Sequence, residues 1–522
     1  EEIAPFYQAC FGEDIRSTLS LVRGGHPDWE AAARQIKRAN GFDPDHHAEL
    51  RRQVRSGQIS LAGNRLPSQT TIEDVVDDDV VELDHLETSD HCETLAAAGR
   101  RALAERRVAV VTFAAGVGSR WTEGAGVVKT VNPFVEMMGR HRSFAEIHLA
   151  KSRKSSAEGE PLQHVFTTSF LTHPAMERHL AETGNYGYDG PVYLSPARSI
   201  GQRLFPMERD LRFLWEEMPE QQLSEHAQRV RDDLRRTLID WTRSKGEGTD
   251  YNENIPEQRF YPPGHWHEIP NLLRGGTLGQ MLIDNPQLEL LMTHNADTLG
   301  AWLDPVVVGH HLASGDALTF EVTYRRIEDV GGGLARVNGK PRLLEGSALP
   351  RQDDEYRLRY YNTLTTWISI DALLDYLGLT RDDIVAVARD DHDACRRLDE
   401  ALRQLERRMP TYLAIKNVKL RWGAGQEDVY PVSQCEKLWG DMSSLEDLPV
   451  GYLVVPRKRG QQLKDPALLD HWRRDGSMAH VQGLCLFPGE KASRRGPLSS
   501  DIRPGRRSID PTTERPTGGH PY

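Results

Sequence analysis

A short apolar run that ends in a glycine-rich turn constrains the fold of this chain more than any other feature. Val108 to Phe113 reads Val-Ala-Val-Val-Thr-Phe, and Ala-Ala-Gly-Val-Gly-Ser-Arg follows at once and ends at Arg120. A continuous β-branched run is typical of a strand buried on both faces. Small residues after it let backbone N–H groups approach phosphate oxygens, and Arg120 and Lys129 add positive charge. We expect a buried strand and an anion-binding loop, although this loop alone fits a simple tight turn equally well.

Further strand candidates indicate the fold class. They are separated mostly by helical or loop stretches long enough for crossover connections, which is the pattern of an α/β sheet. The expected fold is a Rossmann-like (GT-A-like) mixed sheet flanked by helices. The candidates after the first strand are His164–Thr168, Pro191–Leu194, Leu288–Thr293 and Leu318–Thr323.

The sequence pattern divides the chain into four regions. The first is mainly helical, and the α/β core that follows carries a helical insertion at about residues 207–258, whose apolar stripe predicts core or interface packing. A small C-terminal region comes next, and the Pro-, Gly-, Ser- and Arg-rich end predicts a flexible tail. The expected boundaries are 1–105, 106–410, 411–488 and 489–522.

Composition excludes several classes of protein. The chain of 522 residues is 38% hydrophobic and 27% charged, and no segment approaches the roughly 20 apolar residues of a membrane helix. A formal net charge of −12 argues against nonspecific nucleic-acid binding, which needs a basic surface. Five separated cysteines without a C-x-x-C pair argue against a disulfide framework or a cysteine zinc site. The first residues, Glu-Glu-Ile-Ala-Pro, lack the features of a secretion signal, so we expect a cytoplasmic protein.

Four later segments, together with the glycine-rich loop and Lys129, recur in a known order. They are Tyr261-Pro-Pro-Gly-His265, Asn295-Ala-Asp297, Gly331-Gly-Gly-Leu-Ala-Arg before Asn338-Gly339, and Tyr361-Asn-Thr-Leu-Thr-Thr-Trp367-Ile. UDP-glucose pyrophosphorylases carry L-N-G-G-L-G-T…P-K, Y-P-P-G-H-G-D, N-I-D-N-L-G, V-K-G-G-T-L and F-N-T-N-N-L-W-I at similar spacing. The chain resembles this family over roughly residues 105 to 375.

The resemblance implies nucleotidyl transfer to a sugar phosphate. A sugar-1-phosphate oxygen, by default that of glucose-1-phosphate, attacks the α-phosphorus of UTP in line, and pyrophosphate leaves. Bringing two anions together requires positive charge at the attacked phosphorus. The resemblance implies that Lys129 and Arg120 face the triphosphate and that Asp297 ligates Mg²⁺, which prefers one or two carboxylates plus phosphate oxygens and water.

The resemblance also implies the remaining site residues. Nucleotide contacts are expected from the glycine-rich loop, the Pro-Pro-Gly-His segment and the Asn-Ala-Asp segment, and sugar-phosphate contacts from neutral donors and a carboxylate that read hydroxyl patterns. The expected nucleotide-binding residues are Ala114, Ala115, Gly116, Val117, Gly118, Gly264, Asn295 and Ala296. The expected sugar-phosphate-binding residues are His265, Gly332, Glu345, Asn362 and Thr365.

Several positions depart from the family pattern. Ala114-Ala115 replaces Asn-Gly in the glycine-rich loop, and Val128 replaces the proline before Lys129. The base-reading glutamine of the family falls at Ser195-Pro196-Ala197, and Gln202 is the nearest substitute. The position that reads the base in the family is therefore changed in this chain.

A further departure concerns the family's C-terminal lysine, which falls at Ser433 of a Tyr-Pro-Val-Ser segment. We expect Lys437, one helical turn onward, to supply the missing charge in catalysis, with Lys416 or Lys419 as alternatives. Residues 440 to 522 lack hexapeptide periodicity, so the left-handed β-helix of many relatives is expected to be reduced or absent. The oligomeric state stays open.

Two alternative functions fit parts of this pattern, and two clusters of polar residues lie outside it. A metal-dependent glycosyltransferase of similar fold, or a non-catalytic sugar-nucleotide-binding homologue, would each share parts of this pattern. The acidic cluster Asp390-Asp-His-Asp393 near Cys395 is interpreted as a charged helix face. His310-His311 has no partner at zinc-ligand spacing.

Overall fold

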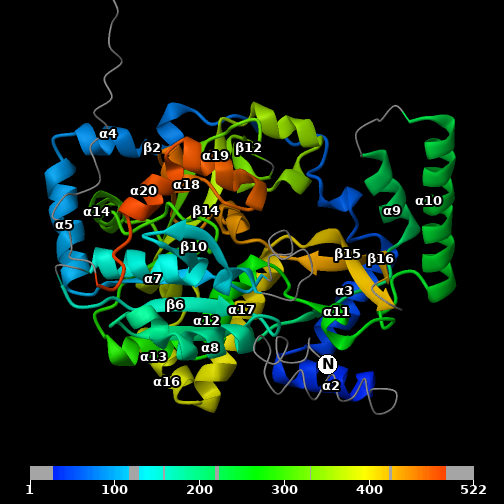
Figure 1. Cartoon of the computed structure of the whole chain (residues 1–522), viewed down its shortest axis with the longest axis horizontal. Coiled ribbons are helices and arrows are strands. Elements are labelled where there is room, and N and C mark those ends of the chain that lie inside the picture. The colour runs from blue at the N-terminus through cyan, green and yellow to red at the C-terminus, as the bar shows by residue number, and fades with distance from the viewer. Residues whose placement is uncertain are drawn as a thin grey trace, which may run out of the picture.

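A computed structural model describes residues 28–116, 128–156, 159–217, 223–329, 331–422 and 426–489 of the chain. Val117, Gly118 and Arg120 of the glycine-rich loop lie outside the described residues, as does the predicted tail after Gly489. The fold is a mixed sheet flanked by helices (Figure 1). The predicted α/β fold class is therefore confirmed.

The central sheet has the strand order β2-β17-β11-β14-β10-β3-β6-β7. Neighbours from β10 to β7 are parallel, as are β11, β17 and β2, whereas β14 runs antiparallel to both β10 and β11. Each strand candidate from the sequence corresponds to a strand of this sheet within two residues at each end. The bounds are β2 (Val81–Glu82), β3 (Val108–Phe113), β6 (His164–Thr168), β7 (Val192–Pro196), β10 (Leu290–Asn295), β11 (Leu318–Tyr324), β14 (Tyr360–Ser369) and β17 (Val450–Val454).

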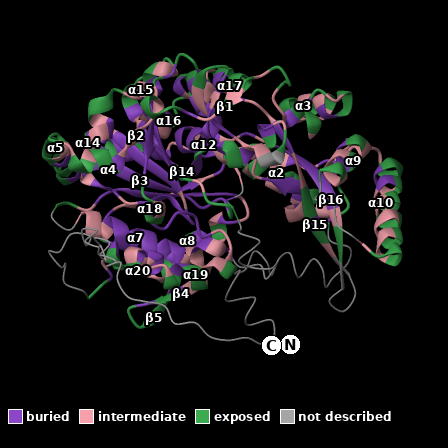
Figure 2. Cartoon of the chain, turned by 90° about the horizontal axis from the view of Figure 1, so that it is seen from above, coloured by how far each residue is buried: buried purple, intermediate pink, exposed green. Residues whose placement is uncertain are grey.

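Strand β3 shows why the sheet is buried on both faces. Its alternate residues Ala109, Val111 and Phe113 belong to one apolar cluster, and Val108 and Val110 belong to another. Successive side chains of a strand point to opposite faces, so a continuous apolar run needs a cover on each side. Figure 2 shows the buried strands between exposed outer helix surfaces.

Two sets of helices provide these covers. One face of the sheet packs against α12 (Glu268–Arg274), α13 (Thr277–Asp284), α15 (Ile370–Tyr376), α16 (Arg381–Ala388) and α17 (His392–Arg408). The other face packs against α4 (Leu83–Thr88), α5 (Cys92–Ala104) and α14 (Pro305–Ser314). The acidic cluster at the start of α17 caps that helix, since the Asp391 carboxylate accepts a hydrogen bond from the Ala394 amide at 2.8 Å.

Both outer regions of the chain contribute to the central sheet. The N-terminal region is mainly helical, with α2 (Trp29–Ala39) and α3 (Pro44–Ser56), but it also supplies β2 and the short β1 (Ile72–Glu73). The C-terminal region supplies β17, which pairs with β11 and β2. A side branch of the sheet joins β1, β12 (Gly333–Val337) and β13 (Lys340–Leu344) to β14. The domain boundaries stay predictions, although the sheet crosses two of them.

A hairpin and a helical pair extend from one side of the core. The hairpin consists of β15 (Tyr412–Trp422) and β16 (Gln426–Glu436), and a two-stranded ribbon of β8 (Gly201–Gln202) and β9 (Phe260–Tyr261) lies beside it. The predicted helical insertion forms α9 (Glu208–Glu216) and α10 (Glu225–Lys245), drawn in green at the right of Figure 1. Val230 and Leu234 of its apolar stripe are more than half exposed, so the described residues give that part of the stripe no core to pack against.

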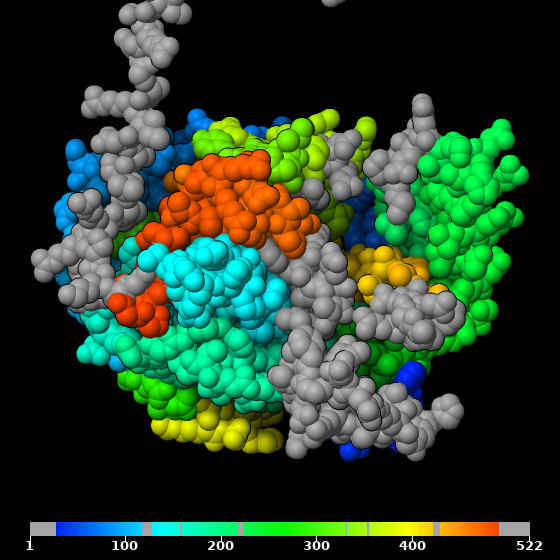
Figure 3. All heavy atoms as spheres, viewed as in Figure 1, coloured from blue at the N-terminus to red at the C-terminus, as the bar shows by residue number. Residues whose placement is uncertain are grey.

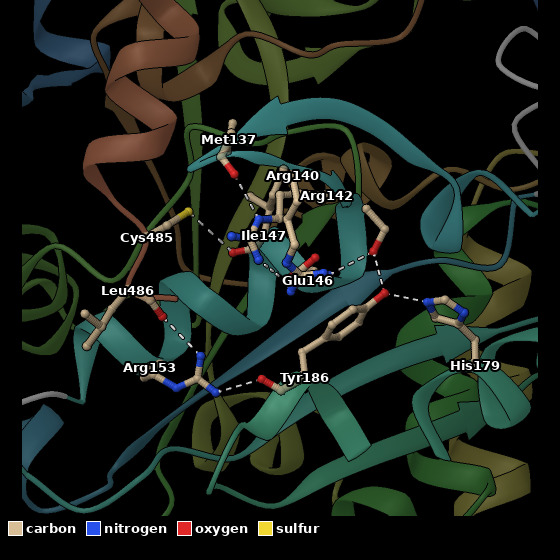
Figure 4. Close-up of polar contacts among 11 residues, drawn as sticks. Met137, Arg140, Arg142, Glu146, Ile147, Arg153, His179, Tyr186, Cys485 and Leu486 are labelled. Atoms are coloured by element: carbon tan, nitrogen blue, oxygen red, sulfur yellow. Dashed lines mark hydrogen bonds and ion pairs between the residues drawn. The ribbon is translucent and has the colours of Figure 1, made fainter. Parts of the chain in front are cut away.

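Helix α7 (Phe144–Ser155) fixes the region in front of the sheet. Ser143 caps it by accepting a hydrogen bond from the Glu146 amide, and the Glu146 carboxylate accepts one from Arg142 at 2.6 Å. Figure 4 shows these contacts together with those of Tyr186, whose hydroxyl lies between Ser143 and His179. Arg140 and Arg142 come from the small hairpin β4 (Pro133–Met137) and β5 (Arg140–Ser143). The start of α7 is thus held in place by charged and polar contacts.

The last described helices pack beside α7. They are α19 (Leu469–Arg474) and α20 (Ser477–Gly483). The remaining α-helices in the described parts of the chain are α8 (His173–Glu182), α11 (Pro256–Arg259) and α18 (Arg457–Gly460). Trp472, Met478 and Val481 share an apolar cluster with Phe144 and Ile147 of α7. Figure 3 shows this orange segment against the cyan segment that includes α7. Among the described residues no helix is long and apolar enough to cross a membrane.

Candidate functional site

The predicted site residues gather at one edge of the central sheet. Parallel strands β3 and β10 end together, because Phe113 lies opposite Asn295. Strand β14 runs the other way, so its first residues, including Tyr361 and Asn362, reach the same edge. The carboxyl edge of an open α/β sheet is where such folds bind their ligands. The topology therefore brings together segments that are far apart in the sequence.

Lys129 and Asp297 form an ion pair at this edge. The Lys129 ammonium lies 3.0 Å from Oδ2 of Asp297, and the two side chains are only 13% and 9% exposed. Burial raises the pKa of Asp297, but the charges of Lys129 and Lys464 outweigh burial, and the resulting pKa is below the ordinary value of an aspartate. Asp297 is consequently a carboxylate, not a neutral acid, at neutral pH.

The second oxygen of Asp297 has the features of a metal ligand. Oδ1 is buried and has no hydrogen-bond partner among the described residues. An orphaned buried carboxylate oxygen is costly unless a ligand satisfies it. No group of three or more His, Cys, Asp or Glu side chains in the described ranges is placed to hold a metal by itself. This donor set fits Mg²⁺, which takes one carboxylate and completes its shell with phosphate oxygens and water.

Helix α7 supports both members of the ion pair. The Lys129 ammonium lies 5.5 Å from the centre of the ring of Phe144, the first residue of α7. His148, farther along the helix, contacts the Ala296 carbonyl oxygen at 2.7 Å, and Lys151 donates to the carbonyl oxygens of Leu299 and Ala301. Burial lowers the pKa of Lys151 to about 7. Side chains of α7 thus contact three carbonyl groups of the loop that carries Asp297.

The glycine-rich loop leaves β3 at the same edge. The Ala114 amide donates to the Thr167 carbonyl at 3.1 Å, and the Ala115 carbonyl accepts from the Ser169 hydroxyl at 2.7 Å. Both residues are buried, whereas Gly116 is exposed and a Cβ placed on it would meet no atom within 4 Å. Alanine is therefore tolerated at the first two positions because neighbouring strands already hold their backbone.

The Pro-Pro-Gly-His segment makes a close backbone contact. Gly264 has φ of +100°, and a Cβ there would lie 2.2 Å from the Lys437 carbonyl oxygen, so only glycine fits. His265 accepts a hydrogen bond from the Trp439 amide at Nδ1, at 2.9 Å. Burial and then the charge of Lys464 lower the pKa of His265 to about 4. At neutral pH this histidine is uncharged, with Nε2 as its remaining N–H donor.

The predicted sugar-phosphate residues surround a partly buried carboxylate. Glu345 lies against Gly332 and Gly440, since a Cβ on either glycine would be 3.4 to 3.5 Å from its carboxylate oxygens. A Cβ on Gly440 would also lie 3.4 Å from the side-chain nitrogen of Asn362. Burial raises the pKa of Glu345 to about 7 against the opposing charge of Lys464. Gly332, Glu345 and Asn362 are therefore neighbours, and the structure links them through Gly440 and Trp439 to His265.

One hydroxyl group and one carboxyl oxygen in this region have no hydrogen-bond partner among the described residues. Thr365 is fully buried, and its Oγ1 has no hydrogen bond among the described residues. Asp441 is also fully buried, with Oδ1 accepting from the Tyr412 hydroxyl at 3.1 Å and Oδ2 unpaired in the same described set. Burial and the nearby Glu345 raise the pKa of Asp441 to about 8. Asp441 was not predicted from the sequence.

The substitutes expected for two family positions lie elsewhere. The Lys437 ammonium is buried and donates to the Met409 carbonyl at 2.9 Å and the Thr411 hydroxyl at 2.8 Å. Only its backbone touches the site, at Gly264. The Gln202 amide donates to the Asn252 side chain at 2.9 Å. Neither side chain joins the cluster around Asp297 in the structure.

Lys464 lies beside the predicted site residues and was not predicted from the sequence. Its ammonium donates to the Tyr361 hydroxyl at 3.1 Å, and its charge acts on Asp297, Glu345 and His265. It follows Gln-Gln-Leu in a loop after β17, and no motif surrounds it. The position of β17 in the central sheet is the signal that brings this loop to the site, and that position is visible only in the structure.

Comparison with known proteins agrees with this geometry. Residues 247–467 match a family model described as UTP–glucose-1-phosphate uridylyltransferase. The chain is also similar to a UTP–glucose-1-phosphate uridylyltransferase of Solanum tuberosum, with 30% identity over 126 residues, which are 23% of this chain and 26% of the relative. The same enzyme of Saccharomyces cerevisiae is 31% identical over 131 residues, which are 24% of this chain and 26% of that relative. The matched stretch spans about a quarter of the length of these uridylyltransferases.

Solved structures show the same fold. The UDP-glucose pyrophosphorylase of Leishmania major has a TM-score of 0.51 at 17% identity, over 84% of this chain and 77% of that one. A uridine diphosphate N-acetylglucosamine pyrophosphorylase from Trypanosoma brucei has a TM-score of 0.53 at 14% identity, over 93% and 89%. Identities this low show a shared architecture, which extends well beyond the segment that matches the uridylyltransferase family.

Proposed function

We propose that this chain is a UTP–sugar-1-phosphate uridylyltransferase that forms a UDP-sugar and pyrophosphate. The observation that carries the proposal is the buried Lys129–Asp297 pair at the carboxyl edge of the sheet. One carboxylate oxygen of this pair is left free. The family match over residues 247–467 includes Asp297 and the predicted sugar-phosphate residues and supports the same reaction.

The proposed chemistry is an in-line displacement at phosphorus. A phosphate oxygen of the sugar-1-phosphate forms a bond to the α-phosphorus of UTP, and the bond from that phosphorus to the β-bridging oxygen breaks. The electron pair leaves with pyrophosphate, so no general base is required for the attack by an ionised phosphate. The protein's task is positioning and charge neutralisation.

The residues of the chain have distinct roles in this scheme. Lys129 neutralises charge on the triphosphate, and backbone N–H groups after β3 approach its oxygens. Gly264 lets the nucleotide come close to the backbone, and the neutral His265 donates a hydrogen bond to a phosphate oxygen. Glu345 and Asn362 bind sugar hydroxyls from the opposite side of the edge.

Asp297 is the proposed ligand of Mg²⁺. The ion would take Oδ1, the orphaned oxygen, with phosphate oxygens and water as its other ligands. When bound, it would neutralise charge that develops between the α- and β-phosphates. Arg120, which lies outside the described residues, stays a proposed partner of the triphosphate.

UTP and glucose-1-phosphate are the proposed substrates, with N-acetylglucosamine-1-phosphate as the second candidate sugar. The names of the curated relatives favour glucose. The Trypanosoma brucei neighbour acts on the N-acetylated sugar nucleotide by its name, and this favours a test of both. We also propose a reducing compartment, the cytoplasm, because the five cysteines lie far apart in the sequence and form no C-x-x-C pair.

One assay tests the proposed reaction and its alternatives. The protein is incubated with Mg²⁺, each of the four NTPs and a panel of sugar-1-phosphates, and pyrophosphate release is measured. We expect the fastest release with UTP and glucose-1-phosphate. Release only with TTP or CTP would support the proposed reaction but show that the base is not uracil.

Absence of release from every pair would refute the enzyme proposal. A glycosyltransferase would then be recognised by hydrolysis or transfer from UDP-glucose with Mg²⁺ or Mn²⁺. A non-catalytic homologue would bind UDP-glucose in a calorimeter without turnover.

A further inference from the structure

The proposed reaction requires more positive charge than Lys129 alone supplies. A triphosphate and a sugar phosphate meet at one carboxylate, Asp297, which adds a negative charge of its own. The expected second lysine, Lys437, uses its ammonium to bind Met409 and Thr411. Lys416 and Lys419 are exposed on the hairpin strand β15, where Lys416 lies 3.7 Å from Glu436.

The loop that carries Lys464 is fixed to the site at several points. The Val455 amide donates to the Val322 carbonyl at 2.8 Å, and the Gln462 side chain donates to the Thr363 carbonyl at 2.7 Å. The Leu463 amide donates to the carbonyl oxygen of Asp297 itself, at 2.9 Å. Lys464 is the next residue, so its position relative to Asp297 is set by the backbone.

A buried ion pair anchors the start of this loop. The Arg459 guanidinium makes two hydrogen bonds to the Glu321 carboxylate, at 2.6 and 2.9 Å, and both side chains are almost fully buried. Trp367 donates to the same carboxylate at 2.8 Å. Bidentate contacts of this kind have little freedom, and they tie the loop to β11 and β14.

The Lys464 ammonium faces the groups that the proposed reaction uses. Among the described residues it donates one side-chain hydrogen bond, to the Tyr361 hydroxyl, although an ammonium has three N–H donors. Its charge acts on Asp297, Glu345 and His265, which the proposed reaction places at the metal, the sugar and a phosphate. The remaining donors are available to an anion at the centre of these three groups.

We propose that Lys464 is a second phosphate-binding lysine, which lies with Lys129 around Asp297 and takes the role that Ser433 cannot perform. The inference rests on the proposed function. With Lys129 and Lys464 both present, the two positive charges exceed the negative charge of Asp297 even before Mg²⁺ binds. The nearby acid Glu345 has its pKa raised to about 7, which limits the negative charge that opposes this arrangement.

The test compares three variants in the pyrophosphate-release assay. Lys464→Met removes the charge and keeps an unbranched side chain, Lys464→Arg keeps the charge, and Lys245→Met removes an exposed lysine from α10 as the matched control. We expect Lys464→Met to lower kcat/KM by about 10²-fold, mostly in kcat, as for loss of one preorganised charge. Lys464→Arg should recover at least about tenfold of this loss, and Lys245→Met should stay within about twofold of the wild type.

Two results would overturn the assignment. A Lys464→Met variant within about threefold of the wild type would exclude a phosphate contact. Equal losses in Lys464→Met and Lys464→Arg, with equal losses of thermal stability, would assign Lys464 a structural role only.

A binding measurement separates this inference from the proposed reaction. UTP with Mg²⁺ is titrated calorimetrically into the wild type and Lys464→Met, whether or not either turns over. Binding at least about tenfold weaker in the variant supports the phosphate contact even if no pyrophosphate is released, in which case only the enzyme proposal fails. Equal affinity, or no binding to the wild type, would overturn the inference.

Discussion

Lys129 and Asp297 form the contact on which the proposed reaction depends most directly. We predict that Asp297→Ala and Lys129→Ala each lower the initial rate of pyrophosphate release by at least about 10²-fold, because each removes one preorganised charge from a largely water-excluded site. Rates are measured with saturating UTP, sugar-1-phosphate and Mg²⁺. Asp233→Ala on the exposed face of α10 is the control and should keep the wild-type rate. Near-normal turnover in either site variant would show that the motif is placed wrongly.

The buried carboxyl group of Asp441 should make the free energy of unfolding depend on pH. Its pKa is raised to about 8 in the folded chain from an ordinary value of 3.8. The folded state therefore holds a proton that the unfolded state releases, and stability falls as pH rises from about 4 to about 8. Asp441→Asn keeps the acceptor for Tyr412 but does not titrate.

The expected result is a stability difference that grows with pH. Relative to the wild type, Asp441→Asn should gain roughly 4 kcal/mol in free energy of unfolding between pH 5 and pH 8. Urea unfolding at several pH values measures the difference. Asp470→Asn, at an exposed carboxylate, should show no such trend, and a flat profile for Asp441→Asn would contradict the assigned burial.

At the scale of elements, helix α7 is predicted to hold the loop that carries Asp297. Lys151→Met would leave the Leu299 and Ala301 carbonyl groups buried without their donor, at a cost of about 2–4 kcal/mol. Amide hydrogen exchange should increase most at residues 296–301, and turnover should fall with it. Lys154→Met, one turn onward, is the matched control, because the Lys154 ammonium donates to the Gly483 carbonyl oxygen and not to this loop. Unchanged exchange in the loop would show that α7 does not position it.

The sequence predicts elements well where a single physical pattern dominates. Continuous β-branched runs identify strands such as β3 and β6 because a strand buried on both faces has no polar alternation to obscure it. The motif around Asp297 predicts its place at the end of β10 for the same reason. The positive φ of Gly264 is a local property that its residue type indicates, whereas its close contact with the Lys437 backbone is visible only in the structure.

Side chains whose position depends on long-range topology could not be predicted. Lys437 lies near the expected place in the sequence, but buried carbonyl and hydroxyl groups bind its ammonium. Lys464 enters the site because β17 pairs with β11 from across the chain, and no local pattern encodes that pairing. The same holds for Asp441, whose partner Tyr412 lies on another element.

At the scale of the whole molecule, we predict that the core does not fold without the C-terminal region, because that region supplies a strand of the central sheet. Strand β17 pairs with β11 on one side and β2 on the other. A chain ended after residue 410 would expose a long strand edge, which favours aggregation. We expect it to lack a cooperative thermal transition and to scatter light, whereas a chain ended after Gly489 keeps every described element and should melt as the full chain does. Cooperative melting of the shorter chain would show that residues 106–410 are an independent domain.

The hydrogen bond between the Leu463 amide and the Asp297 carbonyl has a consequence for protein synthesis. A ribosome adds about 5–20 residues per second and domains tend to fold from their N-terminal side, so Lys129 and Asp297 emerge well before the loop that secures them. For several seconds the nascent chain holds both residues without β17, without the backbone hydrogen bond from Leu463 and without the ammonium of Lys464. The centre is thus assembled late, and a chain released early by a stalled ribosome would be inert instead of partly active.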